Sequence, residues 1–358
     1  MFIYFRDFSH YVMKQEITKL PEMRLTTTQK KVLLGVNAYP HYNDRQLADA
    51  LEMKRSTVTI ARHFLQKQGM YQVSLFPNFS WLDLLYVGMK YGNYGRTKPI
   101  DYSRRMQMMT PDMKIDEAVW SLSSQFYGFS LFYVKDFHPI REQSDAWNAF
   151  FKSQDPSTII HDRIFPPQMI RTYKFLDTHA CLAQTLGLSP LPIKRSTATP
   201  RQLRKKEQHV LLEWAKRPQA SNAFISEKVG VSRSVVGAMK KRLLLTDVVH
   251  LIQLPAFHHL GINLGVFLHL AIYPEQKNFL KALEQCSEVV FLLGAPYDLL
   301  LFALFQDYDS YQRSALSSLV KSEQHFIREP DEILFSLPET KFRLDAAPFL
   351  AKVFKAND

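Results

Sequence analysis

The sequence predicts an α+β protein that contains two tandem copies of one plan, and three observations predict it. A shift of 178 residues places residues 47–58 over residues 225–236 without a gap, so that apolar positions fall on apolar positions and turn positions on turn positions. Each copy starts with apolar residues at helical spacing. Each then continues into segments of strand composition, which in the second copy alternate with helices in the order βαββαβ.

The composition is that of a globular intracellular protein with an anionic partner. The 358 residues include 46% hydrophobic and 22% charged side chains, and the length favours two or three domains. A net charge of +11 favours a polyanion as partner. The two cysteines, Cys181 and Cys286, have no metal-ligand spacing and suit a reducing compartment. Neither a signal peptide nor a membrane-spanning run is found. We therefore expect a cytoplasmic protein with no metal, cofactor or membrane partner.

The second copy contains two short helical patterns that meet at a turn. Ile225 and Val229 are four residues apart, as on one buried helix face. Ser232 is placed to cap the second helix, because its hydroxyl can accept a hydrogen bond from a first-turn amide. Beyond the turn, apolar residues recur at helical spacing, namely Val236, Met239 and Leu243. Two helices joined by a tight turn are typical of a helix-turn-helix.

The outward face of that second helix is cationic in both copies. An amphipathic helix without a ligand explains one such face but not its presence twice, so we expect both helices to bind double-stranded DNA. Residues at the helix start, Arg55 and Ser56 or Arg233 and Ser234, would reach base edges, and the other cations would contact phosphates. The candidate DNA-binding residues are Lys54, Arg55, Ser56, Thr59, Arg62, His63 and Lys67 in the first copy and Ser232, Arg233, Ser234, Gly237, Lys240 and Lys241 in the second.

The first copy supplies the remaining parts of a winged helix-turn-helix. Residues 28–37 have the pattern of a first helix, Asn43 or Asp44 can cap the next, and the recognition-type helix covers residues 55–68. Gly69 is placed to end that helix in the left-handed conformation. A hairpin over residues 71–79 would form the wing, and residues 248–257 would form the wing of the second copy.

The segments after the wings predict a sheet domain in each copy. In the second copy, strands are expected at 262–272, 289–293, 299–305 and 332–337 and helices at 275–286 and 308–323, which is the ferredoxin-like order. A shift of 170 residues aligns Val119 with Val289 and Leu131 with Leu301. The first copy is expected to have strands at 84–89, 119–123, 129–134 and 157–164, helices at 113–118 and 144–152, a basic insert at 91–109 and a linking helix at 171–186.

A proline-containing basic stretch joins the two copies. Residues 194–206 contain six cations and no acid, and residues 188–200 have linker composition. A solvated linker and a linker that follows DNA phosphates explain this run equally well. The second possibility adds Arg204, Lys205 and Lys206 to the candidate DNA-binding residues.

The motif order resembles that of the leucine-responsive regulatory protein (Lrp/AsnC) family of transcription regulators. The residues that carry this resemblance are Val229 to Ser232 with the following helix and the run Gly294 to Leu301, which matches a Gly-x-x-aromatic-Asp-hydrophobic turn. The resemblance implies a sheet domain that pairs subunits, and a small-molecule effector site near Gly294, Tyr297 and Asp298. A turn built by glycine and aspartate alone is the alternative.

Two departures from the family separate this chain from an ordinary member. Family members usually have one copy per chain, so this chain is expected to form an intramolecular pseudo-dimer, with a further homodimer as an additional expectation. The first copy has Ser124 at the glycine position and Gly128 at the aspartate position, which argues against an effector there.

The function that these patterns predict is a DNA-binding transcription regulator, not an enzyme. Siroheme decarboxylases, which resemble the same family in fold, are one alternative, and residues 92–96 superficially resemble part of their signature. Their second-strand histidine has no counterpart, since the chain has Trp120 to Leu122 and Val290 to Leu292 there. An architectural protein that binds DNA without sequence preference is the other alternative.

The expected domain boundaries follow from these segments. They are an N-terminal arm at 1–25, winged helix-turn-helix domains at 26–80 and 204–258, ferredoxin-like domains at 81–170 and 259–340, a linking helix and basic linker at 171–203, and a C-terminal tail at 341–358.

Overall fold

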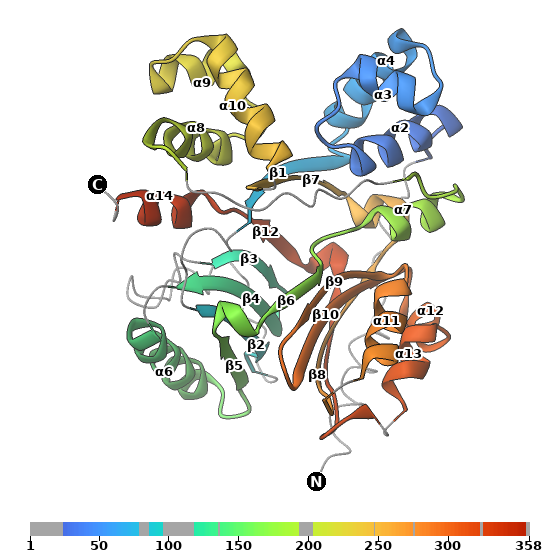
Figure 1. The fold of residues 1–358 in the computed structure, drawn as a ribbon. Helices are drawn as coiled ribbons and strands as arrows, with labels where there is room; N and C mark the ends of the chain where they lie inside the picture. The colour runs from blue at the N-terminus through green and yellow to red at the C-terminus, as the bar shows by residue number, and fades with distance from the viewer. Residues whose placement is uncertain are drawn as a thin grey trace. The chain divides into compact units, whose positions relative to one another are not determined.

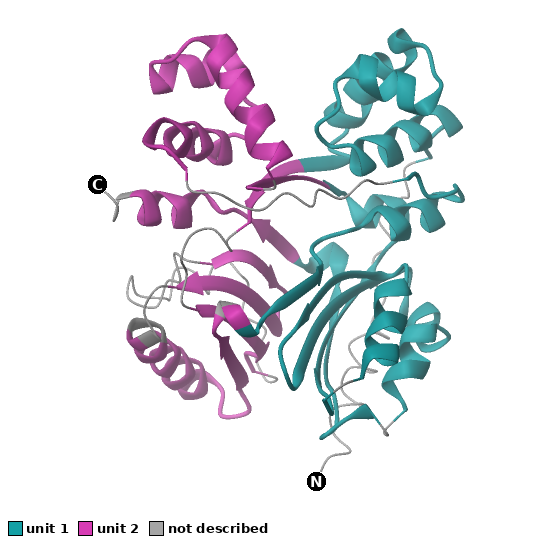
Figure 2. Ribbon diagram, viewed as in Figure 1, with its two compact units in different colours: residues 1–72, 169–192, 254–340 teal, residues 73–168, 193–253, 341–358 magenta. Residues whose placement is uncertain are grey.

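A computed structural model of the chain describes residues 24–78, 86–95, 118–134, 137–192, 203–246, 248–274, 276–322 and 325–355. The chain divides into two compact units (Figure 2). Unit 1 consists of residues 1–72, 169–192 and 254–340, and unit 2 consists of residues 73–168, 193–253 and 341–358. Each unit therefore combines a helical head from one half of the sequence with a sheet from the other half. Nearly all of the arm, most of the insert and linker, and residues 113–117 of the predicted helix at 113–118 lie outside the described residues, and Ala118 belongs to a strand instead.

The head of unit 1 has three helices, as the sequence predicts. They are α2 (Thr27–Ala38), α3 (Asp44–Leu51) and α4 (Arg55–Lys67) (Figure 1). Thr26 and Asn43 cap the first two, each accepting a hydrogen bond from the backbone amide three residues later. Gly69 has φ +65, so the left-handed ending predicted for α4 is confirmed. A further helix, α7 (His179–Leu186), packs against α2 within this unit.

The head of unit 2 repeats this arrangement. Its helices are α8 (Lys205–Lys216), α9 (Asn222–Val229) and α10 (Arg233–Leu245). Helix α14 (Ala347–Lys355) packs against α8, in the way that α7 packs against α2. Fully buried Val210, Ile225 and Leu243 come from one helix each, so this head has an apolar core of its own.

The sheet of unit 1 has five antiparallel strands in the order β11-β8-β10-β9-β6. Four belong to the predicted ferredoxin-like domain: β8 (Leu264–Ala271), β9 (Val289–Gly294), β10 (Asp298–Phe305) and β11 (Asp331–Ser336). The fifth is β6 (Arg171–Lys174). The helices α11 (Lys277–Gln285), α12 (Tyr308–Gln312) and α13 (Ala315–Val320) cover one face (Figure 1). Leu283, Leu301 and Leu316 meet in the core between these helices and the sheet.

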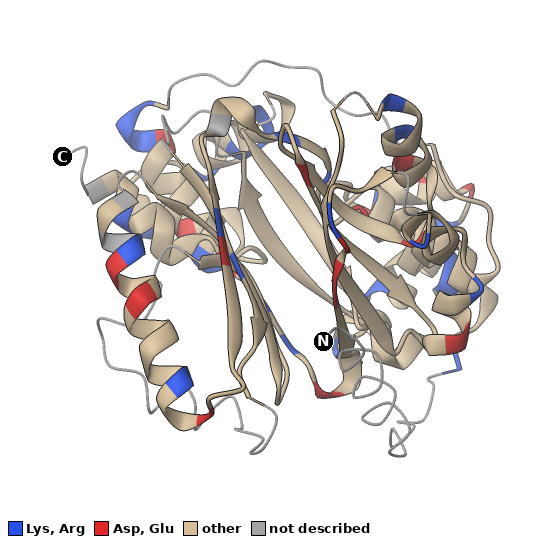
Figure 3. Ribbon diagram, turned by 90° about the horizontal axis from the view of Figure 1, so that it is seen from below, with Lys and Arg blue, Asp and Glu red and all other residues tan. Residues whose placement is uncertain are grey.

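The sheet of unit 2 has the corresponding order, β5-β2-β4-β3-β12. Its strands are β2 (Tyr86–Asn93), β3 (Ala118–Ser123), β4 (Tyr127–Val134), β5 (Ile159–Phe165) and β12 (Lys341–Leu344). The 18-residue helix α6 (Phe137–Gln154) packs on it through Trp147 and Phe151, which cluster with Tyr94. The strands β8 to β11 of unit 1 and β2 to β5 of unit 2, each numbered 1 to 4 along the chain, take the order 4-1-3-2, and most strand positions are uncharged (Figure 3). The α+β class with antiparallel sheets is confirmed.

The predicted wing hairpins are wrong in detail. Each segment is a single strand within the described residues, β1 (Tyr71–Pro77) and β7 (Val249–Pro255), and the two strands pair with each other. In unit 1 the Met70 carbonyl accepts from the Ala256 amide at 2.8 Å, and in unit 2 the Val248 carbonyl accepts from the Asn78 amide at 2.8 Å. Pro77 and Pro255 end the strands instead of turning them back, because proline has no amide to continue a ladder.

The predicted linking helix at 171–186 is only half correct. Its first part is the strand β6, which pairs with β9, and Lys174 Nζ donates to the carbonyls of Cys286 (2.8 Å) and Val289 (2.9 Å). Residues 341–358, expected as a tail, likewise contain the strand β12, which pairs with β3. Four-residue strands have too short a pattern to be recognised locally, because their partners are more than a hundred residues away.

The predicted helix at 308–323 is two helices. Ser314 interrupts it, because its side chain accepts from the Ser317 amide at 3.1 Å and caps α13. The described residues also contain the short 3-10 turns η3 (Pro167–Met169), η4 (Phe257–Leu260) and η6 (Leu337–Glu339). Among the described helices, none has the length and apolar composition that crossing a membrane requires.

Candidate nucleic-acid interface

Helix α10 rests on a buried seam and begins at a well-formed cap. Val236 and Leu243 are fully buried. Ser232 Oγ accepts from the Val235 amide at 3.4 Å and lies 3.0 Å from Ser234 Oγ, so the predicted cap is confirmed. Gly230, at the end of α9, has φ +70, a conformation that glycine adopts without strain. The turn thus sets the direction in which α10 leaves α9.

Only some of the cations predicted on α10 face solvent. Arg233, Ser234 and Lys241 are exposed. Lys240 is half-buried, its Nζ donating to the Ala220 carbonyl at 3.1 Å and lying 4.8 Å from the centroid of the Trp214 ring. Burial lowers the pKa of Lys240 to about 8. Its ammonium therefore braces α10 against the turn before α9.

Two further predicted positions on the second head have structural partners of their own. A Cβ at Gly237 would lie 3.0 Å from Asn222 Nδ2, so glycine permits close approach of α10 to α9. The Arg204 amide donates to Glu207 at 3.0 Å, while the side chains of Arg204, Lys205 and Lys206 are exposed at the start of α8. They form a cationic edge on the first helix of this head, away from α10 in sequence.

An ion pair between a buried glutamate and a half-exposed arginine, which the sequence pattern did not indicate, joins α8 to α10. The side chain of Glu207 is fully buried and pairs with Arg242, whose side chain is 45% exposed. Glutamate is rarely buried without such a partner. Glu207 lies on the apolar face of α8, three residues before Val210, and this position could have indicated a buried carboxylate.

Helix α4 of the first head presents a longer polar face. The predicted residues Lys54, Arg55, Ser56, Thr59, His63 and Lys67 are exposed. Arg62 differs, because its side chain is 18% exposed and pairs with Asp44 at 3.0 Å. Thr59 Oγ1 donates to the other Asp44 oxygen at 2.7 Å. Burial alone would raise the pKa of Asp44, but hydrogen bonds from Thr59 and Arg62 and the arginine charge outweigh it and hold this pKa below its ordinary value.

Arg62 and Lys240 make the same internal contact in the two heads. Arg62 Nη1 donates to the Tyr42 carbonyl at 3.0 Å, and Lys240 Nζ donates to the Ala220 carbonyl at 3.1 Å. The shift of 178 residues places Arg62 over Lys240 and Tyr42 over Ala220. A cation at this position ties the third helix of each head to the turn that precedes the second helix, and a helical projection of the sequence does not reveal this contact.

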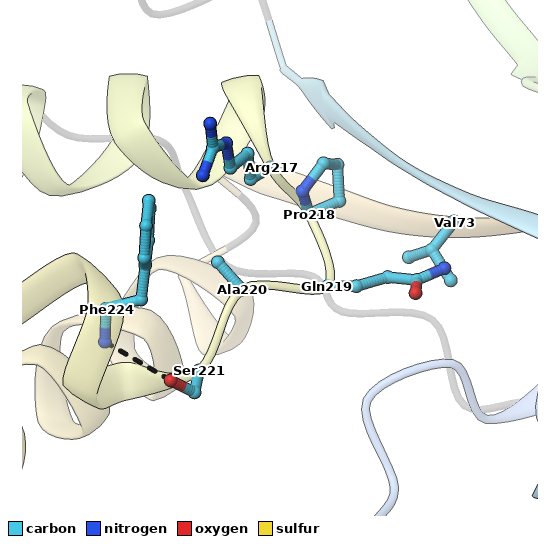
Figure 4. A pocket seen from close by; sticks show the side chains of 7 residues that line it. All are labelled: Val73, Arg217, Pro218, Gln219, Ala220, Ser221 and Phe224. Carbon is cyan, nitrogen blue, oxygen red and sulfur yellow. Dashed lines mark hydrogen bonds between the residues drawn. The ribbon is translucent and has the colours of Figure 1, made fainter.

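Each head has a hollow beside this contact. In the second head it lies at the α8–α9 turn, where Arg217 stacks 4.7 Å from the centroid of Phe224 (Figure 4). The hollow of the first head is lined by Asn43, Asp44, Arg45, Arg55 and Arg62. Arg45, which is exposed at the start of α3, is not among the predicted DNA-binding residues. The feature of the sequence that could have indicated Arg45 is its place in the first turn of a helix, directly after the predicted cap residues.

The predicted effector residues lie at one end of the sheet of unit 1. Asp298 Oδ1 is 2.5 Å from His269 Nε2, and Asp331 Oδ2 is 3.2 Å from His269 Nδ1. His269 is fully buried, whereas Asp298 and Asp331 retain 25% and 23% side-chain exposure. Arg328 Nη2 lies 2.9 Å from Asp331 Oδ2. His269, Arg328 and Asp331 could not be predicted from the sequence, because it is strand pairing that brings His269 and Asp331 together.

The other two predicted effector residues have different roles in this geometry. Tyr297 is 56% exposed in the three-residue segment between β9 and β10. Gly294 lies beneath a tyrosine, since a Cβ there would be 2.9 Å from Tyr173 Cε2. Close approach of the Tyr173 ring therefore explains this glycine.

The corresponding place in the sheet of unit 2 has an aromatic pair. Tyr91 and His161, which the alignment places over His269 and Asp331, stack at 5.2 Å. Gly128 stands where the other sheet has Asp298, and a Cβ there would be 1.8 Å from Tyr94 Oη. The Tyr94 hydroxyl therefore occupies the space that a side chain at this position would need.

The described residues contain no group of three or more histidine, cysteine or acidic side chains suited to a metal ion. Cys181 and Cys286 are buried. Burial raises the pKa of both thiols, that of Cys181 to about 12, which disfavours the reactive thiolate.

The comparisons with known proteins give weak structural likenesses only. No protein-family model and no curated protein match the chain. Among solved structures it is similar to AsnC from E. coli, with 12% identity, 38% of this chain and 93% of that chain covered, and a TM-score of 0.32. A transcriptional regulator from Neisseria meningitidis in complex with L-Met gives 20% identity, 37% and 90% coverage and a TM-score of 0.31. An AsnC-family regulatory protein from Pyrococcus furiosus gives 13% identity, 40% and 89% coverage and a TM-score of 0.27. At these scores we draw no functional conclusion from the likeness.

Proposed function

We propose that the chain is a cytoplasmic, non-enzymatic DNA-binding transcription regulator with two heads, which place α4 and α10 in the major groove of double-stranded DNA. The observation that carries the proposal is the outward face of α10. Arg233, Ser234 and Lys241 are exposed over a buried seam, and the sequence has no acidic residue between Ser232 and Arg242. Such a face attracts phosphates and offers donors to base edges at the helix start.

Two features support the inference that the chain is a tandem duplication acting as an intramolecular pseudo-dimer. Both sheets have the strand order 4-1-3-2, and each receives a fifth strand from the other half of the sequence. Both heads use a cation on the recognition helix to hold the same turn. Because the exposed residues of α4 and α10 differ, the two half-sites of the operator are expected to differ as well.

Salt-dependent binding to duplex DNA tests the proposal. The full chain is titrated into labelled duplexes of promoter and of random sequence at salt concentrations between roughly 50 and 200 mM. The affinity should fall steeply as the salt concentration rises, because the release of counterions from DNA then contributes less free energy. Arg233→Ala and Lys241→Ala should each weaken binding, and Lys241→Ala should reduce the log–log salt slope by about 1. Lys216→Ala, an exposed cation on α8, is the matched control. Absence of salt-dependent binding to either duplex contradicts the proposal.

The same titration distinguishes the two alternatives. An architectural protein would bind promoter and random duplex equally, whereas a regulator should prefer its promoter by a large factor. A siroheme decarboxylase would acquire tetrapyrrole absorbance after incubation with siroheme. We expect none, because the aligned second-strand positions have Trp120 to Leu122 and Val290 to Leu292 and no histidine.

The ionic cluster in unit 1 favours effector control as a second function. Asp298 and Asp331 offer carboxylates to an ammonium group, Arg328 offers a guanidinium to a carboxylate, and Tyr297 offers an exposed ring. A small zwitterion such as an amino acid complements this set. Calorimetry with a panel of amino acids should give binding that Arg328→Met abolishes, with Arg343→Met as control, since Arg343 is a similarly exposed arginine on β12. Equal binding by both variants contradicts the assignment.

A further inference from the structure

Ile60 is the most exposed of the large hydrophobic side chains that the structure describes. It lies in the middle of α4 and is 72% exposed. Packing does not explain an isoleucine at this position, because most of its side chain contacts solvent. Helix propensity does not explain it either, because isoleucine is β-branched and loses side-chain freedom in a helix. The position aligned with it in the second head is Ala238, which is the better helix former.

The neighbours of Ile60 on α4 indicate which surface would cover it. Ser56 precedes it by four residues and His63 follows it by three, so these two exposed polar side chains flank it on one face. Exposed Arg55 and Lys67 begin and end the helix. A face with an apolar centre and cations at both ends complements a DNA groove, where phosphates form the rims and base edges form the floor.

Among base edges, only thymine offers an apolar group to the major groove. Its 5-methyl group is the partner that isoleucine can contact without leaving a polar atom unpaired, whereas the other bases present donors and acceptors there. We propose that Ile60 reads the 5-methyl group of a thymine in the half-site bound by the first head. The inference rests on the proposed function and adds a base and a residue to it.

The helix geometry also gives an approximate position for this thymine. Ile60 is five residues beyond Arg55, which corresponds to about 7.5 Å along the helix axis. Base pairs are about 3.4 Å apart along the duplex. The thymine is therefore expected roughly two base pairs from the base pair that Arg55 contacts. Ala238 is shorter, so the second head should have a weaker methyl dependence.

Replacing thymine by deoxyuridine tests the inference, because this exchange removes only the 5-methyl group. Duplexes selected from a random library by the full chain are resynthesised with one deoxyuridine at a time, and dissociation constants are measured. We expect one thymine whose replacement weakens binding by about fourfold, the effect of burying one methyl group. In Ile60→Ala that discrimination should disappear, and in Ile60→Val it should be reduced.

Matched variants and a mass measurement complete the test. Val235 of α10 is also an exposed apolar residue, and Val235→Ala should leave the discrimination at the Ile60-dependent thymine unchanged. Circular dichroism should give the same spectrum for all variants, since both side chains are exposed. Discrimination that persists in Ile60→Ala, or no methyl-sensitive thymine in a chain that binds DNA, overturns this inference alone. A drop in solution mass on Ile60→Ala overturns it too, by assigning the residue to contact between copies. Failure to bind any duplex overturns the proposed function itself.

Discussion

The two heads share one plan but stabilise it with different chemistry. In the second head, Gly230 adopts the left-handed conformation at the end of α9 and Ser232 caps α10. In the first head, the same two positions are Glu52, with φ +53, and Lys54, which has no side-chain cap. A non-glycine residue in the left-handed region and an uncapped helix each cost about 1 kcal/mol. The turn of the first head is thus under more strain.

The first head has an ion pair between α3 and α4 at positions where the second head has other residues. Asp44 holds Thr59 and Arg62, whereas the aligned residues of the second head are Asn222, Gly237 and Lys240. The carboxylate stabilises the first head but also neutralises part of its cationic surface. Cations at aligned positions, such as Arg62 and Lys240, therefore need not give the two heads the same surface charge. In the second head Glu207 likewise pairs with Arg242, so each head has one cation on its third helix that a carboxylate neutralises.

The largest expected effect is on the second head, where a buried charge would lose its partner. Arg242→Met leaves the buried Glu207 carboxylate without its cation and should destabilise this head by about 2 kcal/mol, less than for a fully buried pair because Arg242 is partly exposed. Hydrogen exchange of the α8 and α10 amides measures the loss. The control Lys216→Met, which removes an exposed pair with Glu213, should cost at most about 0.5 kcal/mol. Equal losses in both variants would contradict this account.

Exchanging the two turns should have the next largest effect. Glu52→Gly with Lys54→Ser should stabilise the first head by about 1–2 kcal/mol, because the strain is removed and a cap is supplied. The reciprocal pair, Gly230→Glu with Ser232→Lys, should destabilise the second head by a similar amount. Amide exchange in α3–α4 and α9–α10 reads out each change. The comparison fails if both double variants shift stability in the same direction.

Acid should weaken the first head through Asp44. Its folded pKa lies below the ordinary 3.8, so its stabilising contribution is fully present above 3.8 and is lost as the pH falls below that value through the folded pKa. Asp44→Asn should therefore cost about 1 kcal/mol at neutral pH. The difference between variant and parent should shrink during acid titration followed by amide exchange of α3 and α4. A pH-independent difference would exclude this ion pair as its cause.

Alkali should have the smallest effect, on Lys240 of the second head. Its pKa is about 8 when folded and 10.5 in the ordinary state, so the unfolded chain binds more protons between these values and stability rises with pH across that window. Lys240 is only half-buried, so we expect a shift of about 1 °C in the unfolding midpoint relative to Lys240→Met. Melting curves of the parent chain and of Lys240→Met are measured side by side between pH 7 and 10. A difference between the two unfolding midpoints that does not change with pH contradicts this expectation.

Local patterns predicted the parts of this fold that depend on near neighbours. The cap at Ser232, the glycine ending at Gly69 and the buried seam of Val236 and Leu243 all involve residues within a few positions of one another. Their hydrogen bonds and helical spacing are visible in the sequence. The strands of the ferredoxin-like order were predicted for the same reason, since long apolar runs between turns are a local signal.

Residue patterns alone predicted the helices of each head, the caps at Asn43 and Ser232 and the four strands of each ferredoxin-like order. Only the tertiary structure decided that β1 pairs with β7, that β6 and β12 complete sheets from the other half of the chain, and that His269 meets Asp298 and Asp331. It also decided that Arg62 and Lys240 hold a turn instead of extending into solvent. The physical reason is the same in each case: these contacts join residues distant in sequence or on different helices, and local periodicity carries no information about their partners.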